Sequence, residues 1–181
     1  MPVLLAMDFQ QGIAGRPEFA PTLANAVRAV DAARAAGIPV MFARVAFRPG
    51  YPEVSAGHPI FGRLRDAGDT MTQDQPATQI HPDLAPRPTE PVITKRRVSA
   101  FAGSDLDVLL RAAAADHLIL AGISTSGVVL STLRQAADLD YRLTVLADAC
   151  ADTDEEVHRV LTEKIFPRQA EVTTTDAWIK G

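Results

Sequence analysis

Short apolar runs alternate with alanine-rich segments of helical periodicity along most of this chain, and this alternation limits its fold more than any other feature. Residues 3–7 (VLLAM) form an uninterrupted apolar run, which is typical of a strand buried on both faces of a sheet. The next segment spaces its apolar residues as a helix does and ends near Gly37, where a helix C-cap residue is expected. Residues 40–46 are predicted to form a second strand. Strand, helix and strand in this order predict a right-handed parallel βαβ unit.

The same order of elements recurs after residue 91. We predict strands at residues 92–94, 117–122, 142–147 and 170–173. We predict helices at residues 105–115 and 155–165, another that begins at Ser124 or Thr125, and a short tail helix that contains Trp178. Six strands that alternate with helices predict a doubly wound, three-layer α/β/α fold with a mostly parallel six-stranded sheet, and residues 1–181 are expected to form a single domain.

Residues 48–91 separate these two halves and carry most of the prolines of the chain. One turn of helix is predicted near residues 61–65, and no other regular element is. A long irregular stretch inside a compact domain is usually functional. We therefore expect this segment to form a wall or lid over a binding site.

Charge and cysteine usage restrict the partners of the protein. A net charge of −4 argues against nucleic acid, because phosphate binding requires a basic face, and the basic cluster at residues 95–97 is short. The single Cys150 excludes an internal disulfide and favours a reducing compartment. The first residues do not form a basic and apolar leader, and no apolar stretch approaches the ~18 residues of a membrane span. We expect a soluble, cytoplasmic protein that does not bind membranes.

Charged and small residues stand where the predicted strands end. Asp8 follows the first strand, Lys95 follows the third, and the fourth runs into residues 122–127 (GISTSG), a small-residue turn that opens a helix. Parallel strands bring their carboxyl ends to one edge of the sheet, where ligands of doubly wound folds bind. The backbone N–H groups of the helix start favour a negative charge there. The sequence therefore predicts a small-molecule site with Asp8 and Lys95 at its centre.

Each of these residues also has a structural explanation when it is taken singly. Asp8 can cap a turn, Lys95 can be a solvated charge, and Ser124 can be a helix N-cap. Asp148 is expected at the end of the fifth strand with a structural role. The functional interpretation rests on the set, since independent capping gives no reason for opposite charges at the ends of separate strands.

Several common site types are excluded by their missing residues. Gly122 and Gly127 have the spacing of a phosphate loop, but Val128 stands where that loop needs lysine. No G-x-G-x-x-G follows the first strand, and no G-x-S-x-G nucleophile elbow is present. The four histidines are scattered without metal-ligand spacing, and surface roles are expected for His117 and His158.

Three ordered motifs resemble those of a known family. They are residues 3–11 (VLLAMDFQQ), 95–101 (KRRVSAF) and 117–132 (HLILAGISTSGVVLST). Their order and spacing resemble the isochorismatase-like hydrolase superfamily, the cysteine hydrolases related to nicotinamidase. Residues 143–152 (LTVLADACAD) extend the similarity, which then covers nearly the whole chain.

The resemblance implies a role for each matching residue. Asp8 and Lys95 match the aspartate and the lysine that the family's amidohydrolases use in catalysis, whereas Val128 stands where they carry the nucleophilic cysteine. Ile123 and Ser124 match the family's non-proline cis peptide. The expected substrate-binding residues are Phe101, Ile123, Ser124, Gly127 and Val128, together with Arg48 from the irregular segment.

The valine at position 128 closes the usual thioester route, because its side chain has no nucleophilic atom. Members of the superfamily that split isochorismate, a vinyl ether, also lack the cysteine, and their aspartate is thought to act as an acid. By this resemblance Asp8 is expected to be the general acid/base of a hydrolase for a small, anionic substrate. Lys95 is expected to position Asp8 or to hold a substrate carboxylate.

The resemblance also bears on metals and on assembly. Residues 44–52 (RVAFRPGYP) lack the histidines of the family's metal-binding nicotinamidases, so we predict no metal and no other cofactor. Arg44 and Tyr51 in this stretch are further candidates for substrate contact. The family usually self-associates, which implies a homodimer or homotetramer. Candidate interface residues are Phe47, Tyr51 and Trp178, for which partial burial within the chain is an equal explanation.

Two alternative functions stay open. In the first, the chain hydrolyses an amide or imide through Cys150 or through a hydroxyl of residues 124–126, although a lone cysteine is more often a buried apolar residue. In the second, the protein has lost catalysis together with the cysteine and only binds a small molecule.

Overall fold

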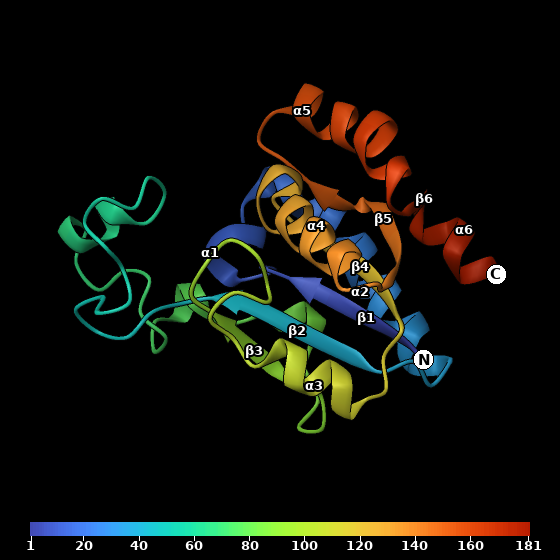
Figure 1. The fold of residues 1–181 in the computed structure, drawn as a ribbon, viewed down its shortest axis with the longest axis horizontal. Coiled ribbons are helices and arrows are strands. Elements are labelled where there is room, and N and C mark those ends of the chain that lie inside the picture. Colours follow the sequence, from blue (N-terminus) through green and yellow to red (C-terminus); the bar gives the residue numbers. More distant parts are fainter.

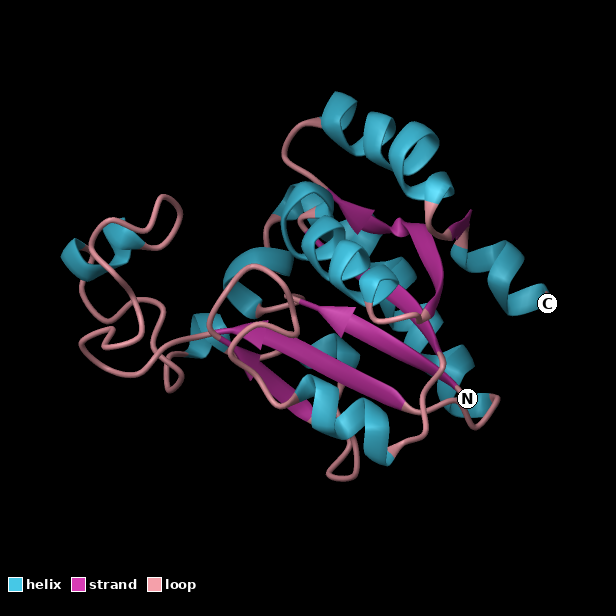
Figure 2. Ribbon diagram, viewed as in Figure 1, coloured by secondary structure: helices cyan, strands magenta, loops and turns pink.

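A computed structural model describes residues 1–181 as six parallel strands with helices on both faces of one sheet (Figures 1 and 2). The strands lie in the order β3-β2-β1-β4-β5-β6, as expected for a doubly wound sheet. They are β1 (Pro2–Met7), β2 (Val40–Val45), β3 (Val92–Lys95), β4 (His117–Ile123), β5 (Arg142–Ala151) and β6 (Glu171–Thr173). The helices are α1 (Gln11–Ala14), α2 (Ala20–Ala35), α3 (Leu106–Ala112), α4 (Leu130–Asp138), α5 (Glu155–Val160) and α6 (Thr175–Lys180).

The apolar run of β1 explains why the sheet needs cover on both faces. Val3, Leu5 and Met7 pack into one core cluster with α3, α4 and the turn after α5. Leu4 and Ala6 alternate with them and pack into the second cluster, against α2. Because successive strand residues point to opposite faces, one buried strand contributes to two cores. The predicted three-layer α/β/α architecture is confirmed.

The predicted strands occur within two residues of their expected bounds, except at the end of β5. This strand continues to Ala151, and its register with β4 shifts between Leu120 and Gly122. Asp148 therefore lies inside the strand and not at its end, which corrects the prediction. Its carboxylate accepts hydrogen bonds from the backbone N–H and the hydroxyl of Thr175, so its predicted structural role is confirmed.

The helix after β4 begins differently from the prediction. Residues Thr125–Val129 form a π-helical turn before α4, and neither Ser124 nor Thr125 caps it through its side chain. The carboxylate of Asp152, which follows β5, accepts a hydrogen bond from the Ser126 N–H at 2.7 Å instead. A side chain from a distant part of the chain therefore satisfies this helix start.

Residues 48–75 form an arm that projects from the sheet, on the left in Figure 1. The arm contains one short 3-10 helix at Gly62–Asp66, close to the predicted turn. A small apolar cluster holds it together, made of Val45, Phe47, Tyr51 and Val54 with Phe61, Leu64 and Met71 packed around them. Phe47 and Tyr51 are buried within the chain, so the interpretation of these two as subunit-interface residues is wrong.

The tail helix α6 packs on α2. Trp178 is half-buried against the second core cluster, and an Arg28–Asp176 ion pair joins the two helices. No helix combines the length and the apolar character that crossing a bilayer requires. A homodimer or homotetramer stays a prediction.

Candidate active site

The side chains of Asp8 and Lys95 meet at the carboxyl edge of the sheet. Asp8 follows β1 and Lys95 is the last residue of β3, so the two groups reach toward each other past the end of β2, which lies between these strands. The Lys95 Nζ atom is 2.9 Å from the Asp8 Oδ2 atom. The two side chains are only 2% and 8% exposed. The predicted pair of opposite charges is therefore present, and it is buried.

The backbone fixes the direction of Asp8. Its φ of 57° lies in the left-handed region, which is unusual for a residue with a side chain and is tolerated best by aspartate and asparagine. The Asp8 N–H donates to the Ala43 carbonyl at 2.8 Å. The chain thus leaves β1 by turning at Asp8 while it remains attached to β2.

Lys95 has more hydrogen-bond partners in this pair than Asp8 has. Lys95 Nζ donates both to Asp8 and to the Arg97 carbonyl at 3.1 Å. The second carboxylate atom of Asp8, Oδ1, is buried and has no hydrogen-bond partner. Burial raises the pKa of Asp8, and the neighbouring Lys95 ammonium opposes this rise without cancelling it. Asp8 is therefore a carboxyl group that holds a proton more readily than an exposed aspartate.

Gln10 supports this arrangement, although the sequence interpretation gave it no role. Its side-chain amide donates to the Val45 and Thr78 carbonyls and accepts from the Val45 N–H. These bonds join the segment after β1 to the end of β2 and to the segment that follows the arm. Gln10 is fully buried, so each of these bonds is shielded from water.

A cavity of about 440 Å³ opens beside the pair. Its lining includes four of the six predicted substrate-binding residues: Ile123, Ser124, Gly127 and Val128. The Ile123–Ser124 peptide is cis, as the family resemblance implied. A Cβ atom on Gly127 would lie 2.6 Å from the Ser124 Oγ atom, so any side chain at this point of the turn would require the Ser124 hydroxyl to move.

Other lining residues were missed. Ile13, Arg16 and Phe19 enter from the segment after Asp8, and Ile60 and Phe61 enter from the arm. The arm thus forms part of a wall, as expected for residues 48–91. The only signal for the first group was their place directly after β1, at the carboxyl edge.

Two predicted contact residues lie elsewhere. Phe101 is buried in the first core cluster and faces Tyr141, with ring centroids 6.3 Å apart, so its role is packing. Arg48 is largely exposed and pairs with Glu53 at 2.6 Å, outside the cavity lining. The prediction that these two contact substrate is not supported, because neither side chain lines the cavity.

The further candidates Arg44 and Tyr51 also have structural roles. Arg44 donates to Thr94 and Gln79, and the Tyr51 hydroxyl donates to the Gly68 carbonyl. Arg44 therefore joins β2 to β3 and to the segment after the arm, whereas Tyr51 joins two parts of the arm to each other.

Neither Cys150 nor Thr125 lines the cavity beside Asp8 and Lys95, so neither is placed to act as a nucleophile there. Cys150 is 3% exposed and lies outside the lining of this cavity, and burial raises the pKa of its thiol to about 12. The Thr125 hydroxyl shares a hydrogen bond of 2.8 Å with His158 Nδ1, but Thr125 is fully buried and does not line the cavity either. His117 similarly bonds the Thr144 hydroxyl. Both histidines are half-buried and bonded to threonine, which corrects the expectation of surface roles.

No group of three or more His, Cys, Asp or Glu side chains in the structure could hold a metal ion. The absence of a cofactor stays a prediction.

Comparison with known proteins places the chain in a family. The isochorismatase domain model matches residues 2–177. The uncharacterized isochorismatase family protein YecD of Escherichia coli O157:H7 is 33% identical over 96% of this chain and 92% of its own length. The ureidoacrylate amidohydrolase RutB of Pseudomonas syringae is 35% identical over 71% of this chain, which spans 57% of that enzyme.

Solved structures give the same result. An isochorismatase family protein from Burkholderia thailandensis superposes with a TM-score of 0.85 and 27% identity, over 99% of this chain and 96% of that one. Fold, sequence and domain model agree. The chain belongs to the isochorismatase family and is a hydrolase.

Proposed function

We propose that this hydrolase acts on a small anionic molecule without a thiol nucleophile and that Asp8 is its general acid/base. The observation that carries the proposal is the buried Asp8–Lys95 pair, which lines a cavity that has valine at position 128. Arg16 and Lys95 are the cations in the lining and Asp8 is its only carboxylate, which favours an anionic ligand.

Vinyl ether hydrolysis suits this arrangement best. Protonated Asp8 delivers its proton to the terminal carbon of the enol ether, and the electron pair of the double bond forms the new C–H bond. The resulting oxocarbenium ion is captured by water, and the hemiketal collapses to an alcohol and a carbonyl compound. The proton that the water releases returns to Asp8.

The two charged groups have separate tasks in this reaction. Burial of Asp8 keeps a proton available at moderate pH, since the raised pKa brings the acid form closer to the working pH. Lys95 stabilises the carboxylate that remains after proton transfer and attracts an anionic substrate. The apolar wall formed by Phe19, Phe61 and Val128 limits solvent around the reacting carbon.

Amide hydrolysis is the second candidate, and the 35% identity to a ureidoacrylate amidohydrolase favours it. With Val128 in place of the cysteine, water must be the nucleophile. Asp8 then takes a proton from the attacking water and passes it to the departing nitrogen.

One assay separates the two reactions. Wild-type enzyme is incubated in D2O with 2-methoxyacrylate, a small anionic vinyl ether, and in parallel with ureidoacrylate, an anionic amide. Vinyl ether hydrolysis gives pyruvate with one deuterium in its methyl group, whereas amide hydrolysis releases ammonia from ureidoacrylate only.

The role of Asp8 is tested on whichever substrate turns over. Asp8→Asn should lower kcat about 10²- to 10⁴-fold, the usual contribution of a general acid or base. Asp138→Asn is the matched control, because Asp138 is exposed and does not line the cavity. Equal turnover by Asp8→Asn and by wild type would end the proposal.

A further inference from the structure

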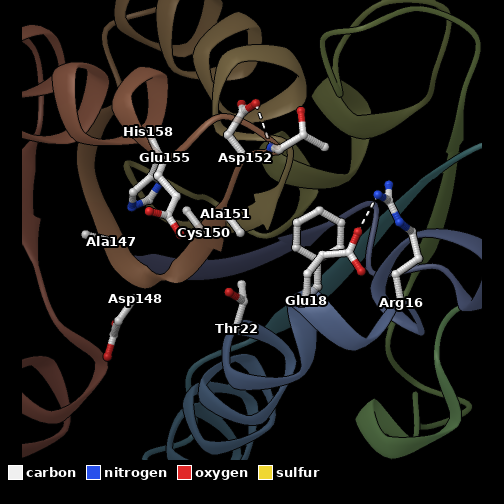
Figure 3. Close-up of a pocket in the computed structure, with 12 residues that line it drawn as sticks. Arg16, Glu18, Thr22, Ala147, Asp148, Cys150, Ala151, Asp152, Glu155 and His158 are labelled. Carbon is white, nitrogen blue, oxygen red and sulfur yellow. Dashed lines mark hydrogen bonds and ion pairs between the residues drawn. The ribbon is translucent and has the colours of Figure 1, made fainter.

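A second hollow adjoins the candidate active site, and the reaction proposed above does not use it (Figure 3). It has a volume of about 550 Å³ and lies between the start of α2, the end of β5 and the start of α5. Arg16, Phe19 and Thr153 line both hollows and separate them. The two hollows differ in charge.

Carboxylates dominate the second hollow. Glu18, Asp148, Asp152 and Glu155 line it, and Arg16 is the only lysine or arginine among its lining residues. Arg16 forms an ion pair with Glu18, so these two charges offset each other. Burial lowers the pKa of His158, which keeps its ring uncharged at neutral pH.

The remaining carboxylates have no cationic partner. Asp152 accepts hydrogen bonds from the backbone N–H groups of Ser126 and Thr153 and forms no ion pair. Glu155 forms neither an ion pair nor a hydrogen bond within the chain, and Figure 3 shows its side chain among the lining residues beside Cys150 and His158. The hollow therefore carries uncompensated negative charge.

Thr22 adds an observation that is independent of the carboxylates. Its side chain lines the hollow from α2, the residue is only 8% exposed, and its hydroxyl forms no hydrogen bond within the chain. The hydroxyl oxygen is not among the fully buried unpartnered atoms, so it is accessible from the hollow and free to accept a hydrogen bond from a ligand there. Phe19, Ala147, Cys150 and Ala151 add an apolar wall.

We propose that this hollow binds a primary alkylammonium group. An ammonium has three N–H donors and no acceptor, which matches the carboxylates of Glu155 and Asp152 and the free hydroxyl of Thr22. The alkyl chain packs on the wall of Phe19, Cys150 and Ala151. A metal ion is a poorer match, because no three liganding side chains come together here. The proposal is independent of the reaction at Asp8.

Butylammonium is the probe that tests this proposal, with butyrate and 1-butanol as controls of equal length and different charge. The full chain is titrated at neutral pH and followed by two-dimensional NMR. Butylammonium should give saturable shifts at the amides of Thr22 and Glu155 but not at Asp8, and its affinity should fall with added salt. Butyrate and butanol should give neither.

Two substitutions identify the contacts. Glu155→Gln should weaken butylammonium binding about tenfold, and Thr22→Val about fivefold, as expected for a charge-assisted and a neutral hydrogen bond. Glu163→Gln, on the exposed turn after α5, is the matched control and should change nothing. Equal binding of the three probes, no saturation up to the solubility of butylammonium, or unchanged affinity in Glu155→Gln would overturn the assignment.

Discussion

Two buried ion pairs lie at opposite ends of the parallel strands. Only in one of them does every carboxylate oxygen have a hydrogen-bond donor. At the amino edge, Arg34 from α2 binds Glu90, just before β3, through two parallel hydrogen bonds of 2.8 Å. Arg34 also donates to the Leu84 and Ala85 carbonyls, and the Arg87 N–H donates to Glu90. Both carboxylate oxygens therefore have donors.

At the carboxyl edge, Asp8 and Lys95 are more deeply buried but are joined by a single contact, and Asp8 Oδ1 has no partner. A buried charge is stabilising only when its hydrogen bonds are complete. The Arg34–Glu90 pair meets this condition and joins α2 to the loop before β3. The Asp8–Lys95 pair does not, because one buried carboxylate oxygen of Asp8 has no donor, and a buried acceptor without a donor costs stability.

The largest effect should come from breaking the incomplete pair on one side. Lys95→Met leaves the Asp8 carboxylate buried without a counter-charge and should lower the free energy of unfolding by about 3–5 kcal/mol. The double variant Asp8→Asn, Lys95→Met removes both charges and should regain most or all of the loss. Urea denaturation of the four proteins measures the cycle. A double variant less stable than Lys95→Met would show that the pair is built for stability.

The Arg34–Glu90 pair should contribute to stability and not to turnover. Glu90→Gln removes the charge that holds Arg34 and should cost about 2–3 kcal/mol, the range of hydrogen bonds to charged groups, with turnover unchanged. Glu163→Gln, from an exposed pair with Arg159, serves as control and should unfold like wild type. Loss of turnover in folded Glu90→Gln would contradict the division between the two edges.

The two carboxylates should also give opposite pH dependences of stability. The hydrogen bond with Arg34 lowers the pKa of Glu90, so its stabilisation is present above the unfolded pKa of about 4.3 and is lost as pH falls. Burial raises the pKa of Asp8, so the stability linked to it is present at acid pH and is lost as pH rises through the folded pKa.

Chemical denaturation across the acid range measures these slopes. The stability advantage of wild type over Glu90→Gln should shrink toward low pH, whereas its advantage over Asp8→Asn should shrink toward high pH. Parallel slopes in the two comparisons would contradict the assigned pKa directions.

The smallest effect is expected at Cys150, which lies outside the cavity beside Asp8 and Lys95. Cys150→Ala should cost about 1 kcal/mol, a typical value for a modest core substitution, and should leave turnover unchanged. Iodoacetamide should label the native protein only as fast as it unfolds, because the buried thiol stays protonated. Rapid labelling with loss of activity would restore Cys150 as a nucleophile.

The sequence predicted the sheet and the central pair because both depend on simple geometry. Parallel strands bring Asp8 and Lys95 to one edge, whatever the loops do. The end of β5 was not predictable, because its last residues continue only through the register shift against Gly122. A bulge of this kind depends on tertiary packing and has no strong local pattern.

The loops were the second source of error. Arg48 and Phe101 stand close in sequence to true lining residues, but Arg48 pairs with Glu53 and Phe101 packs against Tyr141. Arg16 and Phe19, which do line the cavity, were missed. An irregular segment is placed by long-range contacts, and a single sequence does not reveal them.

The position of Lys95 has a consequence for dynamics. Lys95 ends β3, a strand of four residues at the edge of the sheet whose only neighbour is β2. Edge strands open locally at a lower free energy than the whole domain unfolds. Detachment of β3 alone would separate the ammonium from Asp8, so local opening of residues 92–95 would be enough to disassemble the site while the rest of the domain stays folded.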